Sequence, residues 1–435
     1  MKISTWLGKY VLGVSLALVA VSAMAWPLDG YEETGIRRVE GARLANEGLA
    51  IGGFQPPGAQ LTTEQVDLRL VGRNLSLPPP DPAFTAAIVD MLGEDAGAYG
   101  IAVLDFTDPD HLRYAEHRGD YRQNVGSVGK LLVALGLFQA LADTWPDDFD
   151  KRKAILRDTI ITADDFAHSD HHNVRFFDVE TNFLTQRKIA DGDQASLWEY
   201  LDWTLSVSSN SAASMVMRDA MLLRHFGRDY PVSEKQIRTF FSTTPPGELT
   251  RLFQQTFWEP VTRNGLSLDT IRQGSFFTRQ GKANVNGGGN SYATARSLVT
   301  FMLKMEEGLL VDEWSSRQLK RLLYMTERRI RLASSPELRE AAVYFKSGSL
   351  YGCKPEQGFN CGQYRGNRIN YMNSVAVVEQ EVEDVKLRYV VVVISNVLRK
   401  NSSEVHQQLG TEIHKLIKAG DLAATSSASA EPPSN

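Results

Sequence analysis

Apolar side chains recur on a helical period over much of the chain, most densely at residues 127–141. Leu131, Leu132, Leu135 and Phe138 belong to an almost continuous apolar surface there, so we expect this helix to be buried. The same period predicts further helices at residues 81–92, 196–205, 211–225, 293–307, 313–326 and 403–419.

Shorter runs rich in β-branched and aromatic residues predict strands between these helices. Residues 100–106 and 111–117 are expected to pair as a hairpin, because a turn-forming Thr-Asp-Pro-Asp segment joins them. Further strands are predicted at residues 66–71, 342–345, 371–378 and 387–396.

Changes in composition divide the chain into four parts. The second part is rich in glycine, proline and polar residues and ends in a Leu-Pro-Pro-Pro segment, which is typical of a linker. The predicted parts are a signal peptide (1–25), an N-terminal extension and linker (26–80), a compact domain (81–421) and a disordered tail (422–435).

The first part has the form of a cleaved signal peptide. Lys2 and Lys9 flank a segment without acids, a short apolar run follows, and Ala23-Met24-Ala25 supplies a cleavage site. A membrane anchor is the alternative, but the apolar run is shorter than the roughly 20 residues that a spanning helix needs. We therefore expect a periplasmic or secreted protein with no stable membrane insertion after cleavage.

Charge and cysteine content narrow the function further. The net charge of −5 and the isoelectric point near 6.0 provide no basic surface, so nucleic acid is not an expected partner. In an oxidising compartment, Cys353 and Cys361 are close enough in sequence to form one disulfide.

A first candidate motif, Ser127-Val128-Gly129-Lys130, opens the buried helix. Residues three apart share a helix face, so the Lys130 amine can lie against the Ser127 hydroxyl. Burial and the helix N-terminus both disfavour the charged lysine, which makes it a usable proton acceptor for a serine nucleophile. By itself this spacing also occurs by chance.

A second motif, Ser208-Ser209-Asn210, lies at the junction between two predicted helices. A hydroxyl and an amide exposed there could relay a proton and hold a substrate amide. The alternative is a simple helix cap, since serine and asparagine are preferred capping residues.

A third motif, Lys346-Ser347-Gly348, follows the predicted strand at 342–345. A strand would present the lysine and the hydroxyl to a substrate carboxylate, while the glycine lets a ligand lie close to the backbone. The alternative is a strand end with a solvated lysine.

The three motifs together resemble those of penicillin-binding proteins and serine β-lactamases, which carry S-x-x-K, S-x-N and K-[ST]-G in this order. The stretch from about 81 to 416 is similar to a class A β-lactamase-like catalytic domain. Residues 290–323 resemble the segment that precedes the third motif in that family, and the strands after 371 resemble its final hairpin.

The resemblance implies an α+β fold, in which a five-stranded antiparallel sheet is flanked by helices and joined to a mainly helical lobe. It implies acyl transfer through a serine, with no cofactor. The implied roles are nucleophile for Ser127, proton transfer for Lys130 and Ser208, substrate binding for Asn210, Lys346, Ser347 and Gly348, and an oxyanion hole from the backbone N–H groups of Ser127 and Ser349.

The chain departs from the class A pattern in three respects. Ser209 stands where that family has aspartate. Glu259 is the best candidate for the glutamate that activates the deacylating water, but Asn264 follows it by five residues instead of four. Without such a base the acyl-enzyme would persist, as in a penicillin binder or slow hydrolase. Insertions at 151–188 and 229–250 are expected to be loops around the cleft.

The first insertion contains His168-Ser169-Asp170-His171-His172. Clustered histidines can bind zinc, but this spacing matches no established ligand pattern. We therefore predict no metal.

The leading hypothesis is an exported acyl-serine hydrolase acting on β-lactams or related amides and esters. A D-alanyl-D-alanine carboxypeptidase acting on cell-wall peptides would carry the same motifs. A hypothesis of another class is a non-catalytic protein that retains the fold to bind a cell-wall component or a protein partner.

Overall fold

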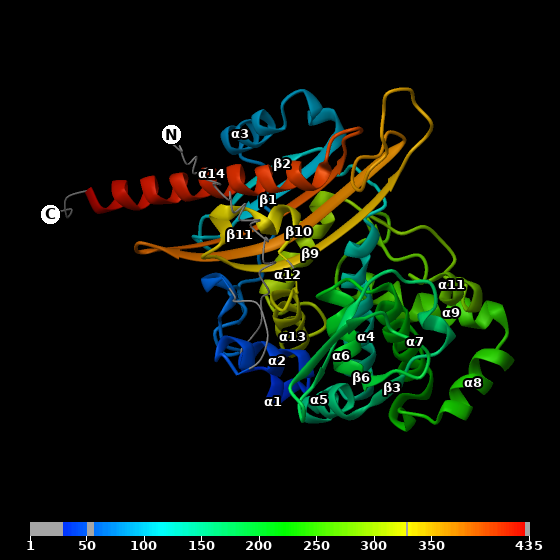
Figure 1. Ribbon diagram of the computed structural model, residues 1–435. Helices are drawn as coiled ribbons and strands as arrows, with labels where there is room; N and C mark the ends of the chain where they lie inside the picture. Colours follow the sequence, from blue (N-terminus) through cyan, green and yellow to red (C-terminus); the bar gives the residue numbers. More distant parts are fainter. Residues whose placement is uncertain (1–28, 50–55, 328, 431–435) are drawn as a thin grey trace, which may run out of the picture.

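The computed structural model describes residues 29–49, 56–327 and 329–430, so the predicted signal peptide lies outside the described residues. Its main sheet has five antiparallel strands in the order β2-β1-β11-β10-β9 (Figure 1). The strands are β1 (Tyr99–Asp105), β2 (Arg113–His117), β9 (Ala342–Gly352), β10 (Ile369–Val382) and β11 (Val385–Asn396).

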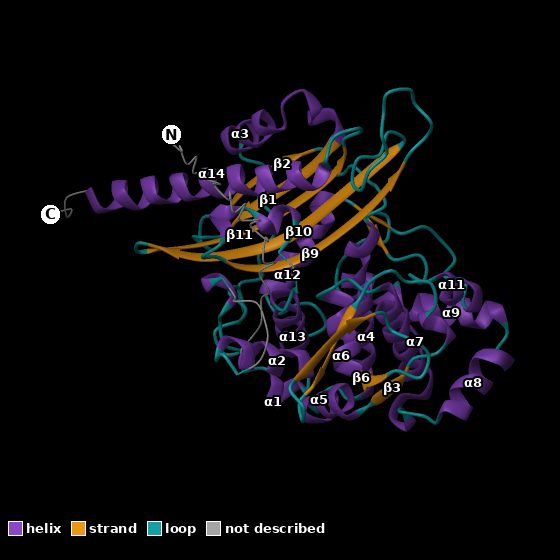
Figure 2. Cartoon of the chain, viewed as in Figure 1, coloured by secondary structure: helices purple, strands orange, loops and turns teal. Residues whose placement is uncertain are grey.

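Both faces of this sheet are covered by helices (Figure 2). Along β1, Ile101 and Val103 join the apolar cluster of one face, and Ala102 and Leu104 join that of the other. Helices α3 (Pro82–Leu92) and α14 (Ser402–Ala430) pack on the first face, and α12 (Ala295–Glu306) and α13 (Glu313–Tyr324) pack on the second. The predicted five-stranded sheet and these four helices are confirmed.

A mainly helical lobe stands beside the sheet, with α4 (Lys130–Thr144) at its centre. Every residue of α4 from Lys130 to Ala142 is buried. Among the described residues, Gly126–Thr144 is the one helical stretch apolar and long enough to cross a membrane, and most of it is buried in the protein. The other helices of the lobe are α5 (Phe149–Asp158), α6 (Leu197–Leu205), α7 (Asn210–Phe226), α8 (Glu234–Thr243), α9 (Pro246–Phe257), α10 (Glu259–Arg263) and α11 (Arg279–Asn284).

The two insertions are structured, which corrects the prediction of loops at 151–188 and 229–250. The first contains most of α5 and the hairpin of β4 (Val174–Asp178) with β5 (Phe183–Arg187). The second contains α8, which starts with a capping box between Ser233 and Gln236. Short strand pairs β3 (Ile160–Thr162) with β6 (Gln194–Ser196), and β7 (Ile271–Arg272) with β8 (Tyr292–Ala293), complete the lobe.

The N-terminal segment is part of this fold, so the prediction of a linker at 26–80 is wrong for its described residues. Ile36 and Val39 are fully buried in the apolar core of the lobe. Arg38 of α2 (Arg37–Asn46) is also buried and forms an ion pair with Asp202 of α6. The same segment contains the short helix α1 (Tyr31–Thr34) and a 3₁₀ turn at Pro57–Ala59.

Two further predictions need correction. Residues 66–71 form no strand: Val66, Leu68 and Leu70 are buried, but the backbone forms turns, and the Leu70 N–H donates to the carbonyl of Glu306. The predicted disordered tail from 422 instead continues α14 as far as Ala430. No glycine or proline interrupts that stretch, which favours continued helix.

Candidate active site

Ser127 lies in a 3₁₀ turn, Gly126–Gly129, that leads directly into α4. Its hydroxyl accepts a hydrogen bond from Lys130 Nζ at 3.1 Å, as the three-residue spacing predicts. The turn is tight because Gly126 has a φ of +54°, a left-handed conformation that favours glycine. The first motif therefore forms a paired hydroxyl and amine at the end of a buried helix.

The second motif converges on the same amine. Lys130 Nζ lies 2.8 Å from Asn210 Oδ1 and 2.6 Å from the Ser208 carbonyl oxygen. Ser208 has a φ of +66°, so the backbone between α6 and α7 bends sharply enough to bring this carbonyl inward. Ser209 of this motif also acts as a helix cap, as the alternative prediction held, because its hydroxyl accepts a hydrogen bond from the Ala212 N–H at the start of α7.

The third motif reaches the second through one hydroxyl. Lys346 of β9 donates to Ser208 Oγ at 2.9 Å, and the same oxygen lies 3.3 Å from Lys130 Nζ. Ser208 therefore bridges two amines, an arrangement that can pass a proton between them.

Gly348 permits the close approach of β9 to the nucleophile. A Cβ on Gly348 would lie 2.1 Å from the Val125 carbonyl oxygen and 2.7 Å from the Ser127 nitrogen, so no other residue fits there. Gly348 thus leaves room for the backbone of the turn that carries Ser127, whereas the sequence suggested that it leaves room for a ligand. The backbone nitrogen of Ser349 also lies close to the nucleophile turn, because a Cβ added to Gly126 would be 3.3 Å from it.

Burial changes the protonation of both lysines. Desolvation lowers the pKa of Lys130 to about 7, although Asp170 opposes the shift. Burial and the nearby charges of Lys130 and Arg331 hold the pKa of Lys346 well below its usual range. Lys130 is therefore substantially neutral near pH 7 and can accept a proton.

Asp170 compensates for the missing aspartate of the second motif. Its Oδ2 accepts hydrogen bonds from Ser209 Oγ (2.8 Å) and from the backbone N–H groups of Asn210 (2.7 Å) and Ser211 (3.0 Å). These donors and His172 hold the pKa of the Asp170 carboxyl well below its usual range. The carboxylate thus reaches the motif from a separate loop, the histidine-rich segment at residues 168–172.

Arg331 is a site residue that the sequence patterns did not reveal. It has a φ of +55°, its Nη2 donates to Ser349 Oγ (3.0 Å), and its guanidinium lies 4.9 Å from the Tyr364 ring centroid. Its Nε and Nη1 are buried with no hydrogen-bond acceptor in the described chain. No local motif marks this arginine, which folding brings beside the third motif.

These groups line one cavity of about 430 Å³. Ser127, Ser208, Asn210, Lys346, Ser347, Gly348 and Ser349 all contribute to its wall, and Arg331 and Tyr364 lie at the end near β9. His171 and His172 form part of the wall contributed by the first insertion. The structure therefore brings together all but one of the predicted site residues.

Glu259 is the exception, and its predicted role as the deacylation base is not supported by its position. Its side chain is 53% exposed and pairs with Arg224, which also binds Asp143 near the far end of α4. Asp143 lies thirteen positions after Lys130 in the same helix, a distance of about 20 Å. Phe277, whose ring centroid is 4.7 Å from Lys130 Nζ, packs beside the amine instead.

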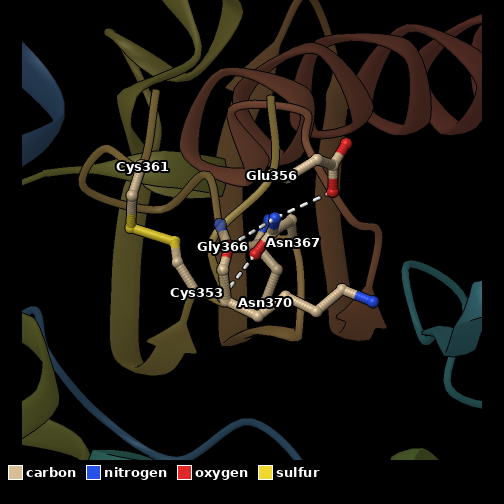
Figure 3. The surroundings of a disulfide bond; sticks show 7 residues. Cys353, Glu356, Cys361, Gly366, Asn367 and Asn370 are labelled. Carbon is tan, nitrogen blue, oxygen red and sulfur yellow. Dashed lines mark hydrogen bonds between the residues drawn. A yellow bond between two sulfur atoms is a disulfide. The ribbon is translucent and has the colours of Figure 1, made fainter. Parts of the chain in front are cut away.

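The predicted disulfide is present between Cys353 and Cys361, in the segment that joins β9 to β10 (Figure 3). Asn367 secures the same segment by hydrogen bonds to the backbone of Lys354 and to Glu356. Tyr364, on the cavity wall, belongs to this segment. The bridge thus closes a braced loop beside the site.

One group of described side chains could hold a metal. Ligand atoms of Asp170, His171 and His172 lie within 4.8 Å of one another. Asp170 already accepts several hydrogen bonds, so a metal would have to compete with the cap of α7 for its oxygens. The prediction that the site uses no metal stays a prediction.

Comparison with known proteins identifies the family. The profile of the Beta-lactamase enzyme family matches residues 83–416, which is most of the chain. The chain belongs to this β-lactamase family. Its match starts inside α3 and ends inside α14, so the family domain includes the whole five-stranded sheet and the lobe. No curated protein matches the chain.

Several solved structures resemble this β-lactamase family member in fold. PBP-A is 15% identical, with a TM-score of 0.47 over 79% of this chain and 100% of its own. A β-lactamase from Sphaerobacter thermophilus is 14% identical, with a TM-score of 0.47 over 77% and 96%. TLA-3 extended-spectrum β-lactamase is 13% identical, with a TM-score of 0.47 over 77% and 98%.

Proposed function

We propose that this protein is an exported serine hydrolase that forms an acyl-enzyme at Ser127. The observation that carries the proposal is the meeting of three distant motifs: Lys130 Nζ lies within 3.3 Å of Ser127 Oγ, Ser208 Oγ and Asn210 Oδ1, and Lys346 Nζ donates to the same Ser208 Oγ at 2.9 Å. A neutral Lys130 takes the proton of Ser127 as Oγ attacks a carbonyl carbon, and Ser208 passes a proton to the leaving nitrogen.

The substrate we propose is an amide that carries a carboxylate, either a β-lactam or a cell-wall peptide. At one end of the cavity Arg331 supplies a cation, and Lys346 and Ser347 supply hydrogen-bond donors, an arrangement that suits a carboxylate. The backbone N–H groups of Ser127 and Ser349 are the proposed oxyanion hole, where loss of one donor typically costs about 3 kcal/mol of transition-state stabilisation.

The remote position of Glu259 favours a slow second step and makes a D-alanyl-D-alanine carboxypeptidase the alternative. A carboxypeptidase and a β-lactamase share the acylation chemistry, but only the β-lactamase must release penicilloate quickly. Penicillin G is a suitable probe for both activities. It forms an acyl-enzyme complex with a variant of PBP-A.

Intact-protein mass spectrometry with penicillin G tests the proposal. We expect the mature protein to gain the mass of one penicilloyl group, and Ser127→Ala to gain none. The time course of mass loss then measures deacylation. No adduct on the wild type, with no hydrolysis of the drug, would contradict the proposed function.

Arg331→Met should weaken recognition of the carboxylate. The methionine retains most of the side-chain volume but removes the buried charge beside Ser349, so we expect acylation by penicillin G to become roughly 10 to 100-fold less efficient. Stopped-flow acylation at several drug concentrations should show weaker binding, with a smaller change in the limiting rate. An unchanged dependence on concentration would remove Arg331 from the binding site.

A further inference from the structure

The cavity contains a second candidate for the base that activates water. The described residues that line it include no aspartate or glutamate. Two histidines that belong to none of the three motifs also line the cavity. The His172 side chain is partly buried, at 24% exposed, whereas that of His171 is 80% exposed.

Asp170 fixes the orientation of this imidazole. Asp170 Oδ1 accepts a hydrogen bond from His172 Nδ1 at 2.6 Å, and the carboxylate is 4% exposed. An ionised carboxylate can only accept, so Nδ1 carries the proton and Nε2 is left with a free lone pair. The pair has the relation between base and orienting acid that general-base catalysis requires.

The same carboxylate ties the imidazole to the nucleophile. Asp170 Oδ2 accepts from the Asn210 N–H, and Asn210 Oδ1 lies 2.8 Å from Lys130 Nζ, which contacts Ser127 Oγ. Asp170 thus holds His172 and the second motif in one arrangement. His172 and Ser127 line the same cavity of about 430 Å³, which has room for water beside an acyl group on Ser127.

We propose that His172, oriented by Asp170, is the general base that hydrolyses the acyl-enzyme. This inference rests on the proposed acylation of Ser127. His172 Nε2 takes a proton from water as the water oxygen bonds to the acyl carbon. The bond between that carbon and Ser127 Oγ then breaks, its electron pair goes to Oγ, and the proton held by His172 returns to Oγ through the water of the cavity. One water is thereby added across the ester.

His172→Gln tests the base directly, with His168→Gln as the matched control. His168 lies on the same insertion and also pairs with an aspartate, Asp191 at 2.6 Å, but it does not line the cavity. With a chelator present, we expect His172→Gln to be acylated by penicillin G at a rate within about threefold of the wild type and deacylated roughly 10² to 10³-fold more slowly. His168→Gln should match the wild type in both steps.

A pH profile separates catalysis from a structural role. Wild-type deacylation should accelerate with rising pH as His172 loses its proton, and this rise should vanish in His172→Gln.

Deacylation of His172→Gln at the wild-type rate, or an equal loss of acylation and deacylation, would overturn the inference. If instead the wild type forms no adduct, the proposed function fails, and that result is distinct from both. Should His172→Gln not fold, the wild-type deacylation profile decides: a rate independent of pH would also overturn the inference.

Discussion

Acylation by penicillin G will be about a thousandfold slower in Lys130→Met than in the wild type. Methionine preserves the length and apolar stem of the side chain but cannot accept the Ser127 proton, and proton transfer by a positioned group is typically worth 10² to 10⁴-fold. The methionine thioether also loses the contacts to Ser208 and Asn210. Single-turnover mass spectrometry measures the rate.

The pH dependence of the wild type provides an independent check on Lys130. Because burial lowers the pKa of Lys130 to about 7, the neutral, proton-accepting fraction grows as pH rises through that value. Acylation should therefore accelerate from acid to mildly alkaline pH and then level off. A rate that falls over this range, or Lys130→Met acylating within tenfold of the wild type with an unchanged thermal midpoint, would show that another group takes the proton.

Arg38→Met will destabilise the folded protein by about 3–5 kcal/mol. The substitution leaves Asp202 buried without the guanidinium that pairs with it, and removal of one partner of a buried ion pair typically has this cost. Burial raises the pKa of Asp202 even with Arg38 beside it, so a lone carboxylate there will be more costly still. Urea denaturation at pH 7 measures the change.

The double variant Arg38→Met/Asp202→Asn is the control. The double variant removes both charges of this pair, while Glu327, the second carboxylate beside Arg38, keeps its ion pair with Arg175. We therefore expect it to recover about half of the loss, as replacement of a whole buried pair is often close to neutral. A loss below about 1 kcal/mol for Arg38→Met would mean that the N-terminal segment adds little to the fold. A double variant no more stable than the single one would assign the effect to packing or to the lost Arg38–Glu327 pair instead of to Asp202.

Local patterns identified the elements that build the site and the motifs that they carry. The apolar run of α4, the helix predicted at residues 196–205 and the apolar strands all follow from local physics, namely side-chain periodicity. The same patterns failed for residues 26–80, because glycine, proline and polar residues describe a loop equally well whether it packs on a core or not. What anchors that segment is the pairing of Arg38 with a residue far along the chain.

The sequence alone predicted the pairing of Ser127 with Lys130, the two partner motifs and the strand on which the third motif lies, because each depends on residues within a few positions of one another. Only the tertiary structure decided that Glu259 is remote, and that Asp170, His172 and Arg331 belong to the site. Those assignments depend on which distant segments share a cavity. Burial and charge placement of that kind are set by the packing of the whole chain, and no local pattern records them.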